Sequence, residues 1–208
     1  MFAGMWMTTD LITVTPDTAL GDAAQLMAEK AIRRLPVLAV INGENRLVGI
    51  VSKSDLARAP RTAASVMAAM TPNPLTTTVD APIESIAAIM RECKIGSLPV
   101  MRGTTLIGLI TESDVFDAFV ELFNLTAVGA RITFDISRGE DILPFVTELA
   151  RKHHMRVSSF ASLHERERPM CVVHFAGTAI EELLEDVWSS HHRVESVVRT
   201  APRPAPGH

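Results

Sequence analysis

Two short segments of the chain place a hydroxyl side chain three residues before an aspartate. The first reads GIVSKSDL and contains Ser52 and Asp55, and the second reads GLITESDV and contains Thr111 and Asp114. This spacing is that of a capping box, in which the two side chains satisfy free N–H groups of a first helical turn. The same pair could instead hold a ligand, because a carboxylate can accept hydrogen bonds from both hydroxyls of a ribose and a helix start attracts phosphate. Both interpretations are open at the level of the motif.

Two features favour a ligand over a simple cap. A capping box more often ends in Glu or Gln, whereas both segments end in aspartate. Both segments also follow directly on an apolar, strand-like run. We therefore expect the aspartates and the hydroxyl residues that precede them to contact a ligand.

The two segments belong to an internal repeat that fills the first half of the chain. MTTDLITVTPDTALGDAAQLMAEKAIRRLPVL aligns with MTPNPLTTTVDAPIESIAAIMRECKIGSLPVM at a constant offset of 63 residues, which places Met7 over Met70 and Pro36 over Pro99. The offset falls to 59 at Ser52 and Thr111, after a loop, INGENR, that absorbs the difference. A repeat of this kind predicts two copies of one structural unit.

Each copy contains the same elements. A short extended piece is followed by a helix with apolar residues at i, i+3, i+4 and i+7, then by two strands joined by a turn, and then by a second helix that begins at the hydroxyl residue. The order is β-α-β-β-α, twice. We expect first helices over 20–31 and 83–93, and strands over 11–14, 35–40, 46–52, 74–78, 98–101 and 105–111.

The second half of the chain follows another pattern. The last helix of the repeat extends to about residue 125, and the order beyond it is β-α-β-β-α-β, a split-βαβ sandwich. Strands are expected over 131–136, 156–163, 170–177 and 193–199, and helices over 141–153 and 179–192. The tail APRPAPGH is proline-rich and is expected to be disordered.

These elements predict an α/β (α+β) protein with two repeat motifs and a smaller third domain. The expected domains are the first motif at 1–62, the second motif at 63–125, the split-βαβ domain at 129–200 and the tail at 201–208.

The repeated pattern carries a family resemblance. IRRLPVL followed by GIVSKSDL, and KIGSLPVM followed by GLITESDV, resemble a tandem pair of CBS domains, also called a Bateman module. The order of the whole chain resembles that of acetoin-utilisation-type proteins, in which a CBS pair precedes an ACT-type domain of ferredoxin-like fold. One position departs from this pattern, because Arg138-Gly139 stands where ACT domains often carry Pro-Gly.

The resemblance implies a ligand and the residues that hold it. CBS pairs commonly bind adenosine ligands between their two motifs, which points to AMP, ADP or ATP as a regulatory ligand, with S-adenosylmethionine as a second choice. The aspartate takes the ribose hydroxyls, the hydroxyl residue three positions earlier contacts phosphate or ribose, and a serine just before the aspartate adds a second hydroxyl. The residues that this assigns to the ligand, with the phosphate-binding Arg33 added, are Ser52, Ser54, Asp55, Thr111, Ser113, Asp114 and Arg33.

The cation is the element in which the two copies differ. A basic residue three positions before the proline of LPV is often a phosphate contact in this family, and it is Arg33 in the first repeat. The second repeat has Gly96 there, with Arg34 and Lys94 as basic residues that could compensate. We therefore expect the two sites to be unequal.

Other functional classes find little support. A net charge of −4 is spread evenly, without a basic block, so nucleic acid is not expected as a partner. No apolar run is long enough to span a bilayer, and the N-terminal residues do not resemble a secretory signal. Two distant cysteines argue against a disulfide framework and fit the cytoplasm.

Catalysis and metal binding are also not expected. Cys93 and Cys171 lie on apolar faces, so both are predicted to be buried core thiols. Adjacent histidines end two helices, where they suit the helix dipole better than a metal, and no catalytic motif is found. The sequence thus predicts a non-catalytic cytoplasmic sensor without a cofactor, as a homodimer, with a regulated enzyme as a further partner. The alternative is a ligand-free dimerising scaffold or protein-interaction module.

Overall fold

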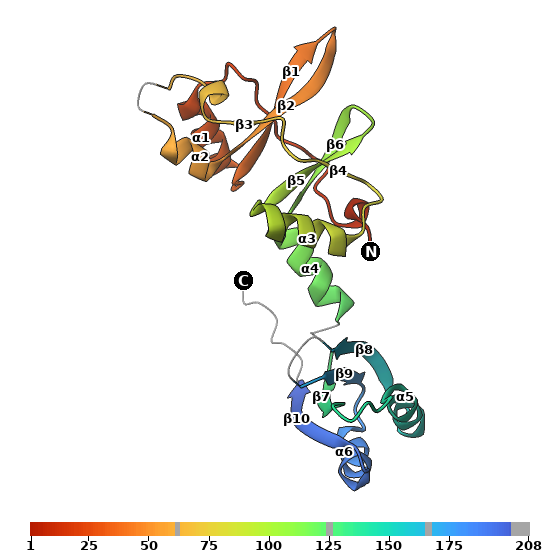
Figure 1. Cartoon of the computed structure of the whole chain (residues 1–208). Helices are drawn as coiled ribbons and strands as arrows, with labels where there is room; N and C mark the ends of the chain where they lie inside the picture. The colour runs from red at the N-terminus through yellow and green to blue at the C-terminus, as the bar shows by residue number, and fades with distance from the viewer. Residues whose placement is uncertain (61–62, 124–126, 165–167, 201–208) are drawn as a thin grey trace. The chain divides into compact units, whose positions relative to one another are not determined.

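The computed structural model divides the chain into two compact units, Met1–Ala118 and Phe119–His208 (Figure 1). Each unit is described by itself. The structure describes residues 1–60, 63–123, 127–164 and 168–200.

The first unit contains both copies of the repeat. The first copy comprises helix α1 (Leu20–Glu29), strands β1 (Arg34–Ile41) and β2 (Glu44–Ser52), and helix α2 (Lys53–Arg58). The second comprises strand β4 (Thr77–Thr78), helix α3 (Ile83–Cys93), strands β5 (Ser97–Arg102) and β6 (Thr105–Thr111), and helix α4 (Glu112–Leu122), of which residues 119–122 are counted in the second unit. Short segments η1 (Ala3–Met5), η2 (Val66–Ala68) and β3 (Thr71–Pro72) connect them. The predicted tandem repeat of helices and hairpins is confirmed.

Some predicted ends differ from the structure. Helix α1 ends at Glu29 rather than at 31, because Ala31 adopts a left-handed backbone with φ of 52° that no α-helix accommodates. The extended pieces are shorter than predicted: Val14 forms a single bridge with Val37, and only Thr77–Thr78 runs parallel to β5. The chain turns into the next helix soon after each of them, which leaves little length for pairing.

The segments that begin the two copies are exchanged between them. Strand β3, from the second copy, pairs antiparallel with β2 of the first, with Ile50 opposite Thr71. Thr8, its counterpart in the first copy, bridges to Leu109 in β6 of the second. The exchange joins the two copies into one structural unit.

A glycine and a methionine meet at each exchanged segment. A Cβ at Gly49 would collide with the side chain of Met70, and a Cβ at Gly108 would collide with that of Met7. The Thr71 carbonyl oxygen lies 3.2 Å from the position of a Cβ at Gly49, and the Thr8 carbonyl oxygen lies 3.2 Å from that of a Cβ at Gly108. Glycine is therefore required where the exchanged segment crosses the hairpin.

The helices and hairpins enclose the core of each copy. The core of the first copy comes from both hairpin strands, from one face of α1, from Val14 in the extended segment before α1 and from Val66 of η2: Val14, Ala23, Met27, Leu35, Val37, Val51 and Val66. The buried residues of the second copy come from both hairpin strands, from one face of α3 and from α4: Ile83, Ile86, Met90, Leu98, Val100, Ile110, Val115 and Ala118. The buried faces of α1 and α3 follow the periodicity from which the helices were predicted.

The second unit is a single antiparallel sheet covered by two helices (Figure 1). Its elements are β7 (Gly129–Asp135), α5 (Leu143–Lys152), β8 (Arg156–Leu163), β9 (Met170–Ala176), α6 (Ile180–Ser189) and β10 (Arg193–Thr200), and the strand order is β10-β7-β9-β8. Alternate strand residues such as Phe134 and Phe175 pack with Val146 and Leu183 of the helices. This is the predicted split-βαβ arrangement. Its assignment to the ACT family stays a prediction.

The helices of the second unit are shorter than predicted. Helix α5 begins at Leu143 because the Asp141 carboxylate accepts the Leu143 N–H at 3.1 Å, which places Asp141 before the helix. Helix α6 ends at Ser189, where the Ser190 hydroxyl donates to the Val187 carbonyl at 2.7 Å. The predicted tail at 201–208 and the predicted helix end at 125 lie outside the described residues. In the part of the chain that the structure describes, none of the helices is long and apolar enough to cross a membrane.

The glycine crossings lead to a stability prediction. Gly49→Val and Gly108→Val each lower the free energy of unfolding of the first unit by about 1–3 kcal/mol, because the new side chain overpacks the crossing. Gly21→Ala is the matched control, since no atom lies within 4 Å of its Cβ, and it leaves stability unchanged or raises it by up to about 1 kcal/mol.

Urea denaturation followed by Trp6 fluorescence measures these changes. A Trp188→Phe background makes the signal specific for the first unit, because the two tryptophans lie in different units and Trp188 is exposed. Valine variants as stable as the parent would show that the crossing is not closely packed.

Candidate functional site

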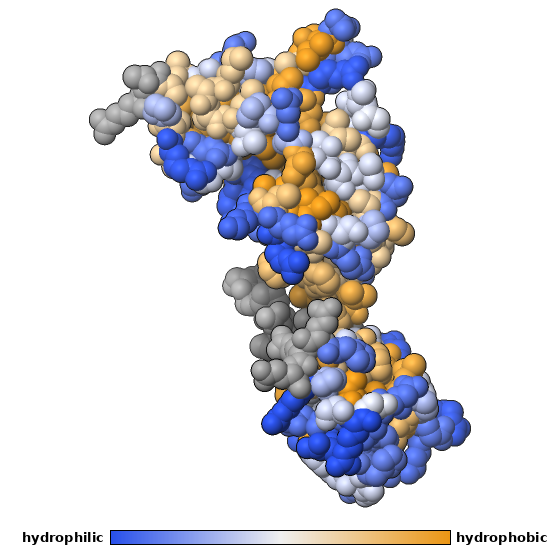
Figure 2. Space-filling view, in the orientation of Figure 1, coloured by the Kyte–Doolittle hydropathy of each residue, from blue (hydrophilic) through white to orange (hydrophobic). Residues whose placement is uncertain are grey.

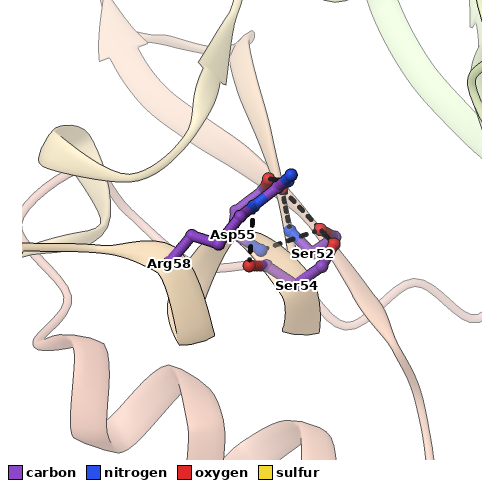
Figure 3. A network of polar contacts seen from close by, with 4 residues as sticks. All are labelled: Ser52, Ser54, Asp55 and Arg58. Carbon is purple, nitrogen blue, oxygen red and sulfur yellow. Dashed lines mark hydrogen bonds and ion pairs between the residues drawn. The ribbon is translucent and has the colours of Figure 1, made fainter.

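The first hydroxyl–carboxylate pair forms a complete capping box at the start of α2 (Figure 3). The Asp55 Oδ2 atom accepts from the Ser52 backbone N–H at 2.9 Å and from the Ser52 hydroxyl at 2.5 Å. The other carboxylate oxygen, Oδ1, accepts from the Arg58 guanidinium at 2.9 Å. Both oxygens of Asp55 are thus engaged within the chain.

The second pair shares the bonds that the carboxylate accepts from the hydroxyl residue, but among the described residues it has neither the guanidinium partner nor the return bond from the aspartate N–H to the hydroxyl. The Asp114 Oδ2 atom accepts from the Thr111 backbone N–H at 2.7 Å and from the Thr111 hydroxyl at 2.8 Å. The counterpart of Arg58 is Asp117, which cannot donate a hydrogen bond to a carboxylate when ionised. No described residue donates to the Asp114 Oδ1 atom, so this oxygen faces no competitor within the described chain.

The environment of Asp55 favours its charged form. Partial burial works to raise the pKa of Asp55, but the hydrogen bonds from Ser52 and the Arg58 guanidinium outweigh it. The pKa of Asp55 is therefore lowered, and the group is a carboxylate at neutral pH.

Two cavities lie beside the two pairs. The Asp55 cavity has a volume of about 450 Å³ and is lined by Ser52, Ser54 and Asp55 of the first copy together with Thr71 and Lys94 of the second. Because β3 is exchanged, the capping box of one copy faces residues of the other. The cavity is a joint product of both copies.

In the Thr111 cavity, which has a volume of about 200 Å³, the contributions of the two copies are exchanged. It is lined by Thr111 and Leu109 of the second copy and by Thr8, Asp10 and Arg33 of the first. Arg33 thus lies with the hydroxyl of the other repeat, and Gly96, its counterpart, lines the Asp55 cavity. This cross-pairing follows from the exchange and was not apparent from the alignment of the repeats.

The predicted site residues are placed as follows. Ser52, Ser54 and Asp55 line one cavity, with 2.8 Å between the two serine hydroxyls. Thr111 lines the other, and Asp114 adjoins it through its hydrogen bonds to Thr111. Ser113 is exposed on α4, and its hydroxyl makes no hydrogen bond with a described residue. Contact of these residues with a ligand stays a prediction.

The sequence did not predict that two further side chains, those of Arg58 and Cys93, line the Asp55 cavity. Arg58 lines it and binds the aspartate, a relation that the i, i+3 spacing could have indicated. Cys93 also lines it and is exposed, so its prediction as a buried thiol is wrong. It is the last residue of α3, and Lys94 turns the chain with φ of 53°, so no further helical turn covers it. Cys171 is buried, as predicted.

The comparison with protein families is decisive for the first unit. The model of the CBS domain matches residues 3–62 and 63–121, which together are more than half of the chain. The chain belongs to the CBS-domain family. The two matched ranges correspond to the two copies of the repeat.

Solved CBS proteins resemble the first unit in structure. CBSX2, in a crystal structure with AMP, is 32% identical, with a TM-score of 0.52 over 57% of this chain and 96% of that chain. The CBS domain pair of protein MJ0100, in complex with 5′-methylthioadenosine and S-adenosyl-L-methionine, is 25% identical, with a TM-score of 0.53 over 57% and 95%. A putative acetoin utilisation protein (AcuB) from Vibrio cholerae is 28% identical, with a TM-score of 0.53 over 60% and 94%.

Curated relatives include enzymes much longer than the matched region. An inosine-5′-monophosphate dehydrogenase of Korarchaeum cryptofilum is 35% identical over 162 residues, which are 72% of this chain and 33% of the enzyme. A homoserine O-acetyltransferase of Methanohalobium evestigatum is 31% identical over 111 residues, which are 52% of this chain and 22% of that enzyme. The chain therefore spans a third or less of the length of these relatives.

The capping box leads to a pH-dependent prediction. Ser52→Ala lowers the free energy of unfolding of the first unit by about 1 kcal/mol at pH 7. The lowered pKa of Asp55 stabilises the fold above the unfolded-state value of about 3.9, and this contribution is lost as the pH falls through the folded-state value. The deficit of Ser52→Ala is therefore full at pH 7 and narrows below about pH 4.

Urea denaturation at pH 7 and at pH 3 checks this expectation. Ser85→Ala is the matched control, because Ser85 is exposed and its side chain caps no helix. An equal deficit for Ser52→Ala at both pH values would contradict the role given to the Asp55 carboxylate.

The cysteines provide a probe of the Asp55 cavity. In the native protein, a thiol reagent modifies Cys93 and spares Cys171, because Cys93 is exposed and burial raises the pKa of Cys171 to about 11. Mass spectrometry of the labelled peptides measures this, and Cys93→Ser is the control. Rapid native labelling at Cys171 would contradict the packing of β9.

Proposed function

We propose that the chain is a non-catalytic regulatory module that binds an adenine nucleotide between its two CBS motifs. The single observation that carries this proposal is the pair of related cavities, each lined by the helix-start hydroxyl of one copy and by polar groups of the other. Asp55 lines one of them, and Asp114 adjoins the other through its hydrogen bonds to Thr111. AMP, ADP and ATP are the leading ligands, and S-adenosylmethionine is second. The module acts as a sensor of energy or metabolite state.

The two carboxylates serve the ribose in different ways. Asp114 offers its Oδ1 atom directly to the ribose hydroxyls while Oδ2 keeps its hydrogen bonds to Thr111. Asp55 first exchanges the Arg58 guanidinium for the ribose, because Arg58 holds the corresponding oxygen. This exchange frees Arg58, which lines the same cavity, to meet an anionic part of the ligand.

Solved relatives support an adenosine ligand. CBSX2 was crystallised with AMP, and the CBS pair of MJ0100 with 5′-methylthioadenosine and S-adenosyl-L-methionine. All of these molecules contain adenosine. We therefore propose that the ligand of this chain also contains adenosine.

The proposal also covers the second unit, the compartment and the oligomeric state of the protein. We assign the second unit to the ACT type on its β-α-β-β-α-β order and strand arrangement. The protein acts in the cytoplasm as a homodimer, and ligand binding in the CBS pair is transmitted to the ACT-type unit or to a regulated enzyme. The open edges of a ferredoxin-like sheet are suited to pairing with a second copy.

A ligand-free dimerising scaffold is the second candidate. A groove of about 600 Å³ between α1 and α2 is lined by apolar residues that include Leu20, Met27 and Leu56. Apolar surface also extends over the β1–β2 hairpin, where Val40 and Ile41 are exposed (Figure 2). Association through these surfaces would need no nucleotide.

A thermal shift experiment separates the two candidates. AMP at 100 times its Kd adds about 2.7 kcal/mol to the stability of the bound unit, which is a rise in Tm of roughly 5–10 °C for a protein of this size. Asp55→Ala and Asp114→Ala each reduce the response, because each removes the ribose contact of one cavity.

The control is Asp22→Ala, which removes an exposed carboxylate from the first turn of α1, away from both cavities. No shift with millimolar AMP, ADP, ATP or S-adenosylmethionine would reject the sensor. A dimer that persists without ligand would then favour the scaffold.

A further inference from the structure

The helices of the two copies present different surfaces at corresponding positions. In the first copy, α1 and α2 enclose a groove of about 600 Å³, and small exposed residues such as Gly21 and Ala57 line it. The offsets of the repeat place Glu84 and Phe116 at the corresponding positions of α3 and α4. The first copy is therefore hollow where the second carries large side chains.

The α1–α2 groove is open and apolar. A Cβ at Gly21 would meet no atom within 4 Å, and Leu20, Met27 and Leu56 supply apolar walls. Such a groove gains from an apolar side chain that displaces water from it.

Phe116 projects from the second copy. Its side chain is 70% exposed, whereas Val115 and Ala118 on the same helix are buried. A single exposed apolar residue is common on protein surfaces, but this one lies at the position where the other copy has a groove. An aromatic side chain can bury roughly 150–250 Å². Because Phe116 is exposed in its own chain, a ring that fills the α1–α2 groove comes from a second chain.

The charges beside these two features are also reversed between the copies. The Lys53 N–H donates to the Arg33 carbonyl at 2.9 Å, and both residues line the α1–α2 groove. At the corresponding place in the second copy, the Glu112 N–H donates to the Gly96 carbonyl at 3.2 Å. Two cations of the first copy thus correspond to a carboxylate and a glycine of the second.

Helix α4 is acidic along its length and has no basic residue; its acidic residues are Glu112, Asp114, Asp117 and Glu121. Arg34 of the first copy lies beside Glu112. Burial lowers the pKa of Arg34, and the Glu112 carboxylate opposes this shift. The two side chains form no hydrogen bond or ion pair in the part of the chain that the structure describes. Because a carboxylate accepts several hydrogen bonds, Glu112 retains acceptor capacity for a second cation.

These differences favour one way of pairing two chains. If the first copies faced each other, two empty grooves would meet and Lys53 of both chains would repel. If the first copy faces the second, Phe116 enters the groove, and Glu112, one helical turn away, approaches Lys53 and Arg33. A twofold axis makes this contact twice.

We propose that two chains pair with the first copy of one against the second copy of the other, so that Phe116 of each chain occupies the α1–α2 groove of its partner. The attraction between Lys53 and Glu112 sets this orientation. The inference rests on the homodimer within the proposed function and specifies its surface. The contact needs no bound nucleotide.

Crosslinking of the full-length chain without ligand tests the orientation. Ala28→Cys places a thiol in the α1–α2 groove, and Ser113→Cys places one on α4 at i, i+3 from Phe116. Both variants carry Cys93→Ser, and the remaining Cys171 is buried. A short bismaleimide crosslinks the mixture of the two variants more strongly than either variant alone, because a groove thiol then faces an α4 thiol of the other chain.

Sedimentation equilibrium measures the strength of the contact. Phe116→Ala raises the dissociation constant of the dimer by about thirtyfold or more, as expected for a central aromatic anchor. Lys53→Glu and Glu112→Lys each weaken the dimer, because like charges then meet at both contacts. An equimolar mixture of these two variants restores it, since each contact again joins one cation and one carboxylate.

Val40→Ala is the control for loss of an exposed apolar side chain. Val40 is 72% exposed on β1 and does not line the α1–α2 groove, so its variant leaves the dissociation constant unchanged. Melting curves of all variants show that they are folded.

The outcomes separate this inference from the proposed function. Crosslinking of each variant with itself, and not in the mixture, overturns the orientation and leaves the homodimer intact. If Phe116→Ala changes neither the dissociation constant nor the crosslinking yield, the groove contact is overturned. If the wild-type chain is monomeric, the proposed homodimer fails and the inference fails with it, whereas the thermal shift with AMP still reports on nucleotide binding.

Discussion

The structure of the first unit depends on one exchange of chain segments. The strand Thr71–Pro72 completes the hairpin of the first copy, and Thr8 pairs with the hairpin of the second. The crossing is close enough that only glycine fits beneath it at positions 49 and 108. The shared lining of the two cavities follows from this exchange, because it brings the capping box of one copy against the loop and strand start of the other.

The hydroxyl–carboxylate pairs show why capping and ligand binding need not be alternatives. Asp55 uses one oxygen for the N–H and hydroxyl of Ser52 and the other for Arg58, whereas Asp114 uses only one oxygen for its cap. A carboxylate has enough lone pairs to do both, provided that its second oxygen is accessible. One structural difference between the two sites is therefore a guanidinium on Asp55 and none, among the described residues, on Asp114.

Local pattern was sufficient to predict most of the elements but not their partners. The apolar periodicity located helix α3 at residues 83–93, and the repeat revealed the duplicated order. The exchange joins residues 21 to 23 positions apart at β2 and β3, and 101 positions apart at Thr8 and Leu109. A two-residue strand and a single bridge leave no periodic signal in the sequence. The same limit explains why Arg33 was not foreseen beside Thr111, and why Cys93 was wrongly placed in the core: its helical face was correct, but the helix ends there.

The Arg34 side chain of the first copy fills the space beside Gly96 of the second, which has a consequence for substitutions in a duplicated chain. A substitution in one copy alters the lining of the cavity beside the other copy's helix, so neither half can change its recognition chemistry alone. Two adjacent arginines in one half and two small residues in the other form a complementary set. The two copies therefore form one region in which each cavity is lined by both, rather than two independent binding sites on one chain.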